Sequence, residues 1–241
     1  MLHQTKGIVF HSIKYSETSL IVKIYTELFG LQSYLFRGIR SSKSKTKPGL
    51  FQPLTLLELV VYHKEKNSLQ SVKEIRLSHP FHMIPFDIRK SSVALFIDEL
   101  LYRSIKEEEA NPDLFEFIWE SCLLLDSIEE PVTNFHLIFA LQLAIHLGIT
   151  PQHNHDSGSP IFNLREGLFQ KSVPDHPHYL DPENSKVFLA LLNTPLPMQS
   201  SLELKPDVRS GLLETILLYY RLHLPGFKGL KSHHILHSVL S

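Results

Sequence analysis

The sequence contains only one cysteine, Cys122, among its 241 residues. One thiol excludes a disulfide within the chain and a zinc site built from several cysteines. Because Cys122 lies among apolar residues, we expect it to pack in the core as a small hydrophobic side chain. No apolar run approaches the roughly 20 residues that a membrane span needs, and the amino terminus lacks the pattern of a signal peptide. We therefore expect a cytoplasmic protein that makes no membrane contact.

Catalytic motifs are also missing. The sequence has no glycine-rich phosphate loop, no G-x-S-x-G motif and no HExxH motif. Adjacent carboxylates occur only in runs such as 107–109 and 129–130, which are typical of solvated surfaces. We expect a protein that is not an enzyme and needs no cofactor.

Acidic residues are scarce in the first third of the chain. Residues 1–80 contain twelve Lys and Arg, five Glu and no Asp, a net charge of +7, whereas residues 81–241 carry −8, which gives −1 for the whole chain. A basic segment joined to an acidic one favours a polyanionic partner for the first segment and a different partner for the second.

The first third has the pattern of β-structure. Short runs rich in β-branched and aromatic residues, several of them alternating, are bounded by turn residues and predict five strands. The predicted strands span 6–13, 18–27, 31–37, 54–63 and 68–77. Five strands without a helical segment favour a small barrel of the OB-fold type, a class that binds oligonucleotides on one face and through its loops. We assign residues 1–79 to this domain.

A basic loop follows the third predicted strand. Its cations are separated mainly by serines, and no acidic residue lies among them; they are Arg37, Arg40, Lys43, Lys45 and Lys47. Such a loop suits contacts to phosphates, which hold a nucleic acid without reading its sequence, although many basic loops are simply solvated. Tyr34 and Phe36 precede it and share one face of the strand. They can stack on bases if that face is exposed, or belong to the core if it is not.

The rest of the chain, 80–241, is predicted to be a helical domain. Helical periodicity is found over 91–107, 111–129, 132–148, 182–193, 205–224 and 230–240. We expect Ser91 and Asn111 to cap the first two helices and Gly148 to end the third. The proline-rich segment 149–181 interrupts the pattern and predicts an insert with a small β-hairpin formed by IFNL and GLFQ. The overall fold class is α+β.

Two His-x-His pairs flank this hairpin. They are His153 with His155 and His176 with His178. Residues two apart on a strand point the same way, so each pair offers two ligands for a metal ion. Exposed histidines without metal are the commoner situation, and we expect no metal site.

The chain resembles the bacterial RecO family of recombination mediators. The resemblance is most specific in GIVFHSIKYSETSLIVKIYTELFGLQSYLFRGIRSSKSK and PLTLLELVVYHKEKNSLQSVKEI, and it extends to LLYYRLHLPGFKGLKSHHIL near the end. It implies an OB-fold that binds single- and double-stranded DNA, anneals complementary strands and helps to load the RecA recombinase. The implied partners are RecR and the acidic tail of the single-strand DNA-binding protein, and the implied location is the cytoplasm, at the nucleoid during repair. The family's basic barrel residues correspond to Arg37, Arg40, Lys43 and Lys45.

One departure from the family is clear. Many members fold the insert around a four-cysteine zinc site, whereas 151–181 contains no cysteine here. We expect the hairpin to be held by apolar packing rather than by the histidine pairs. Two other functions stay open: an RNA-binding OB-fold protein, and a metal-dependent hydrolase that uses those histidines.

Overall fold

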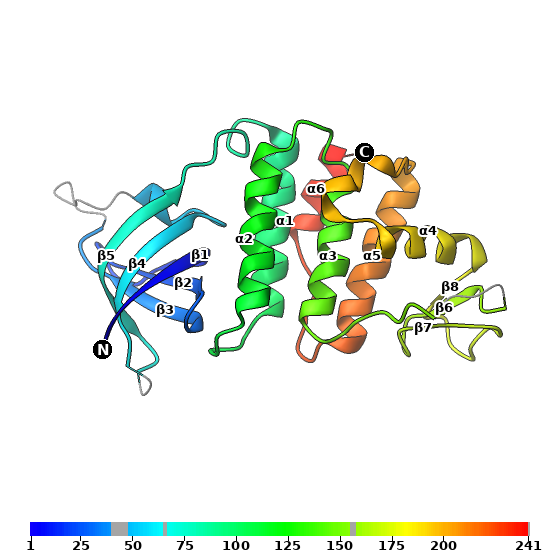
Figure 1. Ribbon diagram of the computed structural model, residues 1–241, viewed down its shortest axis with the longest axis horizontal. Helices are drawn as coiled ribbons and strands as arrows, with labels where there is room; N and C mark the ends of the chain where they lie inside the picture. The colour runs from blue at the N-terminus through cyan, green and yellow to red at the C-terminus, as the bar shows by residue number, and fades with distance from the viewer. Residues whose placement is uncertain (40–47, 65–66, 155–157, 241) are drawn as a thin grey trace. The chain divides into compact units, whose positions relative to one another are not determined.

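The computed structural model describes residues 1–39, 48–64, 67–154 and 158–240. Figure 1 shows a barrel of strands, a set of helices and a small separate sheet. The barrel strands are β1 (Leu2–Lys14), β2 (Leu20–Thr26), β3 (Gly30–Phe36), β4 (Leu56–Tyr62) and β5 (Gln70–His79), with the 3-10 helix η1 (Pro48–Phe51) before β4. The helices and the small sheet are α1 (Ile88–Ser104), α2 (Pro112–Ser127), α3 (Phe135–His146), β6 (Ile161–Asn163), β7 (Leu168–Gln170), β8 (Tyr179–Leu180), α4 (Pro182–Asn193), η2 (Leu196–Ser201), α5 (Pro206–His223) and α6 (Ser232–Leu240). The α+β class is confirmed.

The five strands close into a barrel in the order β1-β2-β3-β5-β4. The first half of β1 pairs with β4 and its second half with β2, with an irregularity between Val9 and His11. Because an irregularity of this kind bends a strand, β1 can serve both neighbours. A short parallel pairing of β3 with β5, which joins Tyr34 to Gln70 and Leu35 to Ser71, completes the barrel.

The structure divides into two compact units. The barrel unit comprises residues 1–86 and 105–126, and the helical unit comprises 87–104 and 127–241. Helix α2 therefore groups with the barrel, whereas the sequence pattern joined it to the other helices. The contacts within the barrel unit explain this grouping: Leu31 N–H donates to the Glu107 carbonyl at 3.0 Å, and the ring centroids of Tyr25 and Phe115 lie 6.1 Å apart.

The predicted helix boundaries are mostly right, with one error. Asn111 Oδ1 accepts a hydrogen bond from Leu114 N–H at 3.1 Å, so it caps α2 as expected. Gly148 follows α3 with a φ of 74°. Ser91, however, is not the cap of α1. That helix begins at Ile88, and Asp87 Oδ1 accepts the N–H groups of Arg89 and Lys90 at 2.8 and 3.2 Å, because aspartate is as good a cap as serine.

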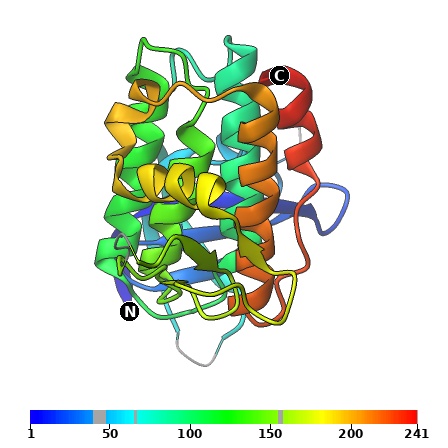
Figure 2. The same cartoon turned by 90° about the vertical axis from the view of Figure 1, so that its right-hand side faces the viewer.

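The helical unit is held by α3, which is buried on nearly all sides, and by α1, whose apolar stripe is buried. Helix α6 packs against α1, and α4 lies next to the small sheet (Figure 2). In that sheet β6 pairs with both β7 and β8, so the predicted hairpin is confirmed and gains a third short strand.

Apolar packing holds the insert. The buried ring of Phe162 lies 4.9 Å from Phe169, 4.6 Å from Phe188 on α4 and 6.2 Å from Tyr219 on α5, measured between centroids. These aromatic contacts each add to the gain from burying apolar area and join the small sheet to α4 and α5. The expectation that IFNL packs on the helices is confirmed, and Phe169 of GLFQ packs on Phe162.

Candidate nucleic-acid interface

The aromatic residues predicted on β3 point into the barrel. Tyr34 is fully buried and Phe36 is 6% exposed, and both belong to the barrel core with Val22 and Ile24. The ring of Phe36 lies 4.5 Å from that of Phe51, between centroids, and burial raises the pKa of the Tyr34 hydroxyl well above its usual value. The suggestion that Tyr34 and Phe36 stack on bases is therefore wrong for this structure, because their shared face is the interior one.

The same alternation turns Arg37 outward. If Tyr34 and Phe36 face the core, then Ser33, Leu35 and Arg37 lie on the other side of the chain. Arg37 is exposed, and Ser33 and Leu35 are half-buried. Gly38 follows with a φ of 70°, a conformation that glycine adopts without strain. The first cation of the basic loop thus lies on the outer surface of the barrel.

The strand register brings further residues next to Arg37. Ile13 pairs with Ile21, which pairs with Leu35. Two positions along each strand, a second row of outward-facing residues joins His11, Lys23 and Ser33. Tyr15 follows Ile13 at the outer end of β1. We call this outer surface the β1–β3 face; its residues are His11, Ile13, Tyr15, Ile21, Lys23, Ser33, Leu35 and Arg37, and none of them is acidic.

Lys23 was not among the residues predicted for binding. The signal for it was present, since Lys23 alternates with Val22 and Ile24, both of which are fully buried. A lysine between two core positions of one strand must face outward. A single cation on a strand is a weaker signal in a sequence than the dense charge of the loop.

The described residues on either side of the basic loop belong to the barrel core. Arg40, Lys43, Lys45 and Lys47 lie outside the described residues. On either side of them, Ile39 and Phe51 are 5% and 4% exposed and belong to the barrel core.

Lys6 and Arg76 contact side chains of the barrel unit itself. Lys6 lies 5.1 Å from the centroid of the Trp119 ring on α2, a cation–π contact. Arg76 forms an ion pair with Glu58, and the register places Glu58 between Lys6 and Arg76 in one row. This charge-balanced surface contrasts with the β1–β3 face.

Helix α2 limits the accessible part of the barrel. Phe10 stacks on Tyr25 at 5.5 Å between centroids, and Phe115 and Trp119 of α2 continue the aromatic series. Tyr25 is consequently 1% exposed although it alternates with core residues. Within the barrel unit, the outer surface of β2 is thus covered at its Tyr25 end, and Lys23 and Ile21 lie on the remaining part.

Metal ligation and membrane spans can be checked only over the part of the chain that the structure describes. The rings of His176 and His178 lie 5.9 Å apart, His153 is exposed, and His155 lies outside the described residues. Over the described ranges, no three His, Cys, Asp or Glu side chains gather as metal ligands would. None of the helices in those ranges is long and apolar enough to cross a bilayer.

Models of one protein family match both parts of the chain. The family model for the N-terminal part of recombination protein O (RecO) matches residues 1–81, and the model for its C-terminal part matches 85–234. The chain belongs to the RecO family. The N-terminal RecO match covers all five barrel strands, whereas α2, which the structure groups with the barrel, falls in the C-terminal match.

Individual relatives agree over almost the full length. The chain is 39% identical to the DNA repair protein RecO of Bacteroides fragilis over 233 residues, 96% of each chain. It is 39% identical to the protein of the same name from Flavobacterium psychrophilum over 240 residues, 99% of each chain. At 30% identity over 246 residues, the relative from Porphyromonas gingivalis also aligns over 99% of each chain.

Proposed function

We propose that this protein is a DNA-binding recombination mediator that acts in DNA repair without catalysing a reaction. Membership of the RecO family supports the role in repair, since the relatives carry the name DNA repair protein RecO. The observation that carries the binding step is the β1–β3 face, whose residues include Arg37 and Lys23 and no acidic residue. In this proposal the face, together with the basic loop, holds the phosphates of single- and double-stranded DNA.

Charge neutralisation accounts for the rest of the proposed activity. In this proposal Arg40, Lys43, Lys45 and Lys47, which follow Arg37 in the sequence, provide further phosphate contacts. Two complementary strands bound there repel each other less, because the protein has displaced their counterions and shields their charge. Annealing follows without any catalytic group.

The partners proposed for the chain follow the family resemblance. We propose that RecR binds this protein, that the acidic tail of the single-strand DNA-binding protein binds its helical domain, and that RecA is loaded on the DNA as an indirect consequence. In the division expected from the sequence, residues 1–79 bind DNA and 80–241 serve the protein partners. Purified RecR and a synthetic acidic tail peptide, titrated separately, test these two contacts.

A charge-reversal variant tests the DNA-binding step. Arg40, Lys43 and Lys45 are changed together to Glu, and binding to a fluorescent single strand is measured by anisotropy over a series of salt concentrations. Each phosphate contact contributes roughly 0.7 to the slope of log K against log salt, so losing three contacts lowers the slope by about 2 and the affinity at 0.1 M salt by about 100-fold.

The matched control carries the same change in charge elsewhere. Lys171, Lys186 and Lys228 lie in the helical unit and are exposed, so their combined reversal to Glu keeps the affinity within a few-fold. Equal losses in both variants, or none in the first, contradict the proposed site. A single-stranded RNA of the same sequence, bound more tightly than the DNA, would instead favour an RNA-binding OB-fold protein.

A further inference from the structure

Tyr15 is an exposed aromatic residue beside the proposed phosphate contacts. Its side chain is 62% exposed, at the point where β1 leads into the turn before β2. The turn is closed by hydrogen bonds from Tyr15 N–H and Ser16 N–H to the Ser19 carbonyl, at 3.0 and 3.4 Å. Because these bonds fix the backbone of Tyr15, the ring is presented from a defined position.

An apolar row lies next to Tyr15 on the outer surface of the barrel. Ile13, Ile21 and Leu35 are consecutive partners across three strands. Ile13 is 45% exposed, and Ile21 and Leu35 are half-buried. Exposing an apolar row together with a tyrosine on a small barrel is unfavourable unless something covers it, and such patches often mark binding sites.

The charges around this row favour a nucleic acid as the occupant. Lys23 lies one outward position beyond Ile21, and Arg37 one beyond Leu35, so cations stand on both sides of the apolar row. The only acidic residue within 1–26 is Glu17, in the turn itself. A surface that alternates cations with apolar and aromatic side chains matches a strand whose phosphates and base faces alternate.

We infer that Tyr15 stacks on an unpaired base of single-stranded DNA and that Ile13, Ile21 and Leu35 contact the face of the neighbouring base. This inference rests on the proposed function, because it concerns the same face. Tyr15 thus takes the base-stacking role suggested by the sequence for Tyr34 and Phe36, which are buried in the core. Bases in a duplex are already stacked and paired, so Tyr15 contributes to the binding of single strands only.

The test compares single-stranded and duplex DNA of equal length. Tyr15→Ala is expected to bind the single strand more weakly by on the order of tenfold, within the roughly 5- to 160-fold range of one lost stack. Duplex affinity stays within twofold, and the salt slope is unchanged because no phosphate contact is lost. Tyr15→Phe, which keeps the ring, retains single-strand affinity.

Phe86→Ala is the matched control, since Phe86 is also an aromatic residue of the barrel unit and is 85% exposed. It leaves both affinities unchanged. Equal losses for Tyr15→Ala on single strand and duplex, or no loss on either, overturn the inference. Unchanged DNA binding with weaker binding of purified RecR also overturns it, and assigns the row to a protein partner.

This design separates two kinds of failure. If the wild-type protein binds neither DNA form at low salt, the proposed function itself fails. If the wild type binds both forms and the loop variant weakens both, while Tyr15→Ala changes neither, only the stacking inference fails. Retained duplex binding also reports that the variant is folded.

Discussion

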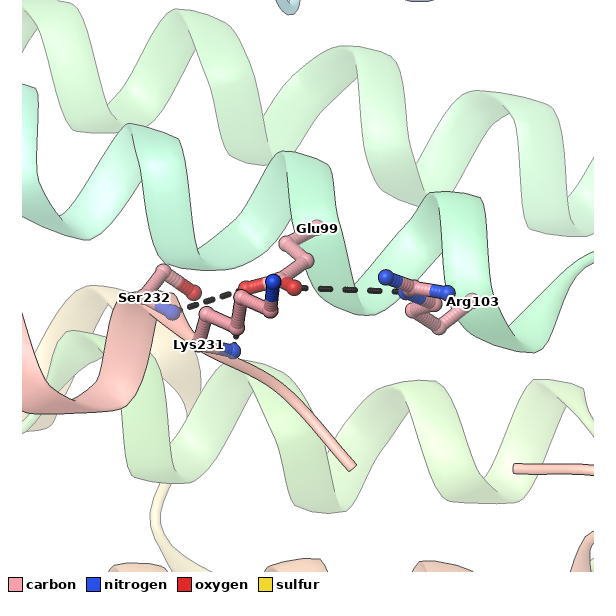
Figure 3. Close-up of polar contacts among 4 residues, drawn as sticks. All are labelled: Glu99, Arg103, Lys231 and Ser232. Atoms are coloured by element: carbon pink, nitrogen blue, oxygen red, sulfur yellow. Dashed lines mark hydrogen bonds and ion pairs between the residues drawn. The ribbon is translucent and has the colours of Figure 1, made fainter. Parts of the chain in front are cut away.

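Glu99 on α1 provides the amino-terminal cap of α6, and removing its charge should loosen that helix. Glu99 Oε2 accepts the N–H groups of Lys231 and Ser232, both at 2.8 Å (Figure 3). The first N–H groups of a helix have no partner within it, so this carboxylate from another helix satisfies them. Arg103 lies one turn further along α1, with its Nε 3.9 Å from Glu99 Oε1.

The magnitude follows from the two hydrogen bonds. Bonds to a charged group contribute about 1.5–3 kcal/mol each, against about 1 kcal/mol for neutral ones. Glu99→Gln keeps an acceptor of the same size and loses only the charge. We therefore expect the free energy of local opening of α6 to fall by about 1–2 kcal/mol. Glu99→Ala removes the acceptor as well, and we expect a loss of about 2–3 kcal/mol, reduced where water reaches the freed N–H groups.

The assay is hydrogen exchange of the amides of Ser232–Leu240, which reports the local opening of α6. In Glu99→Gln these amides should exchange about five- to thirtyfold faster, while those of α3 change little. Glu214→Gln is the control, because Glu214 is exposed and reaches α6 only through His233, at 3.5 Å. Unchanged exchange in both Glu99 variants, or an equal effect in the control, would refute the reasoning.

The contribution of Glu99 also depends on pH. Burial raises the pKa of Glu99, but the N–H groups of Ser232 and Lys231 and the charge of Arg103 together outweigh this, and the pKa lies below its ordinary value of 4.5. The stabilisation is therefore complete above that value and disappears as the pH falls through the lower pKa of the folded state. The protection of the α6 amides, measured relative to their intrinsic exchange rate at each pH, should therefore fall on acidification in the wild type and not in Glu99→Gln.

Two further predictions concern buried side chains of the helical unit. Burial and the charge of Arg209 lower the pKa of His136 to about 3, from an ordinary value of 6.5. Because only the unfolded state binds this proton between pH 7.5 and 5.5, lowering the pH over that range decreases the free energy of unfolding by about 1.4 kcal/mol. His136→Gln should therefore flatten the pH dependence of urea unfolding by that amount, and an unchanged dependence would exclude a neutral His136. Phe162→Ala should lower the free energy of unfolding by about 3–5 kcal/mol, whereas Val173→Ala in the same insert, at an exposed position, changes it by less than about 0.5 kcal/mol; similar losses in urea melts of the two variants would contradict the packing account.

Much of the fold could be predicted because local patterns and tertiary packing agree. The five barrel strands are rich in β-branched and aromatic residues and several of them alternate apolar and polar residues, and the end of α3 has a glycine where the chain turns away from the helix. The basic loop was also predictable as a charged segment, since charge density needs no structure to be seen. Its contact with DNA stays a prediction.

Other features depended on the three-dimensional arrangement. Alternation placed Tyr34 and Phe36 on one face, but only the closed barrel decided that this face is the interior. Tyr15 lies in a turn with no distinctive pattern, and it became a candidate only when the register placed Ile13, Ile21 and Leu35 beside it.

From the sequence alone follow the α+β class, the positions of most strands and helices, and the segregation of positive charge into the first 80 residues, because each depends on residues close together in the chain. The tertiary structure alone decided which side of β3 faces outward, that α2 packs with the barrel, and that Glu99 caps a helix 133 residues away. These depend on contacts between distant segments, and the free energy of such contacts comes from burial and hydrogen bonding that exist only once the chain has folded.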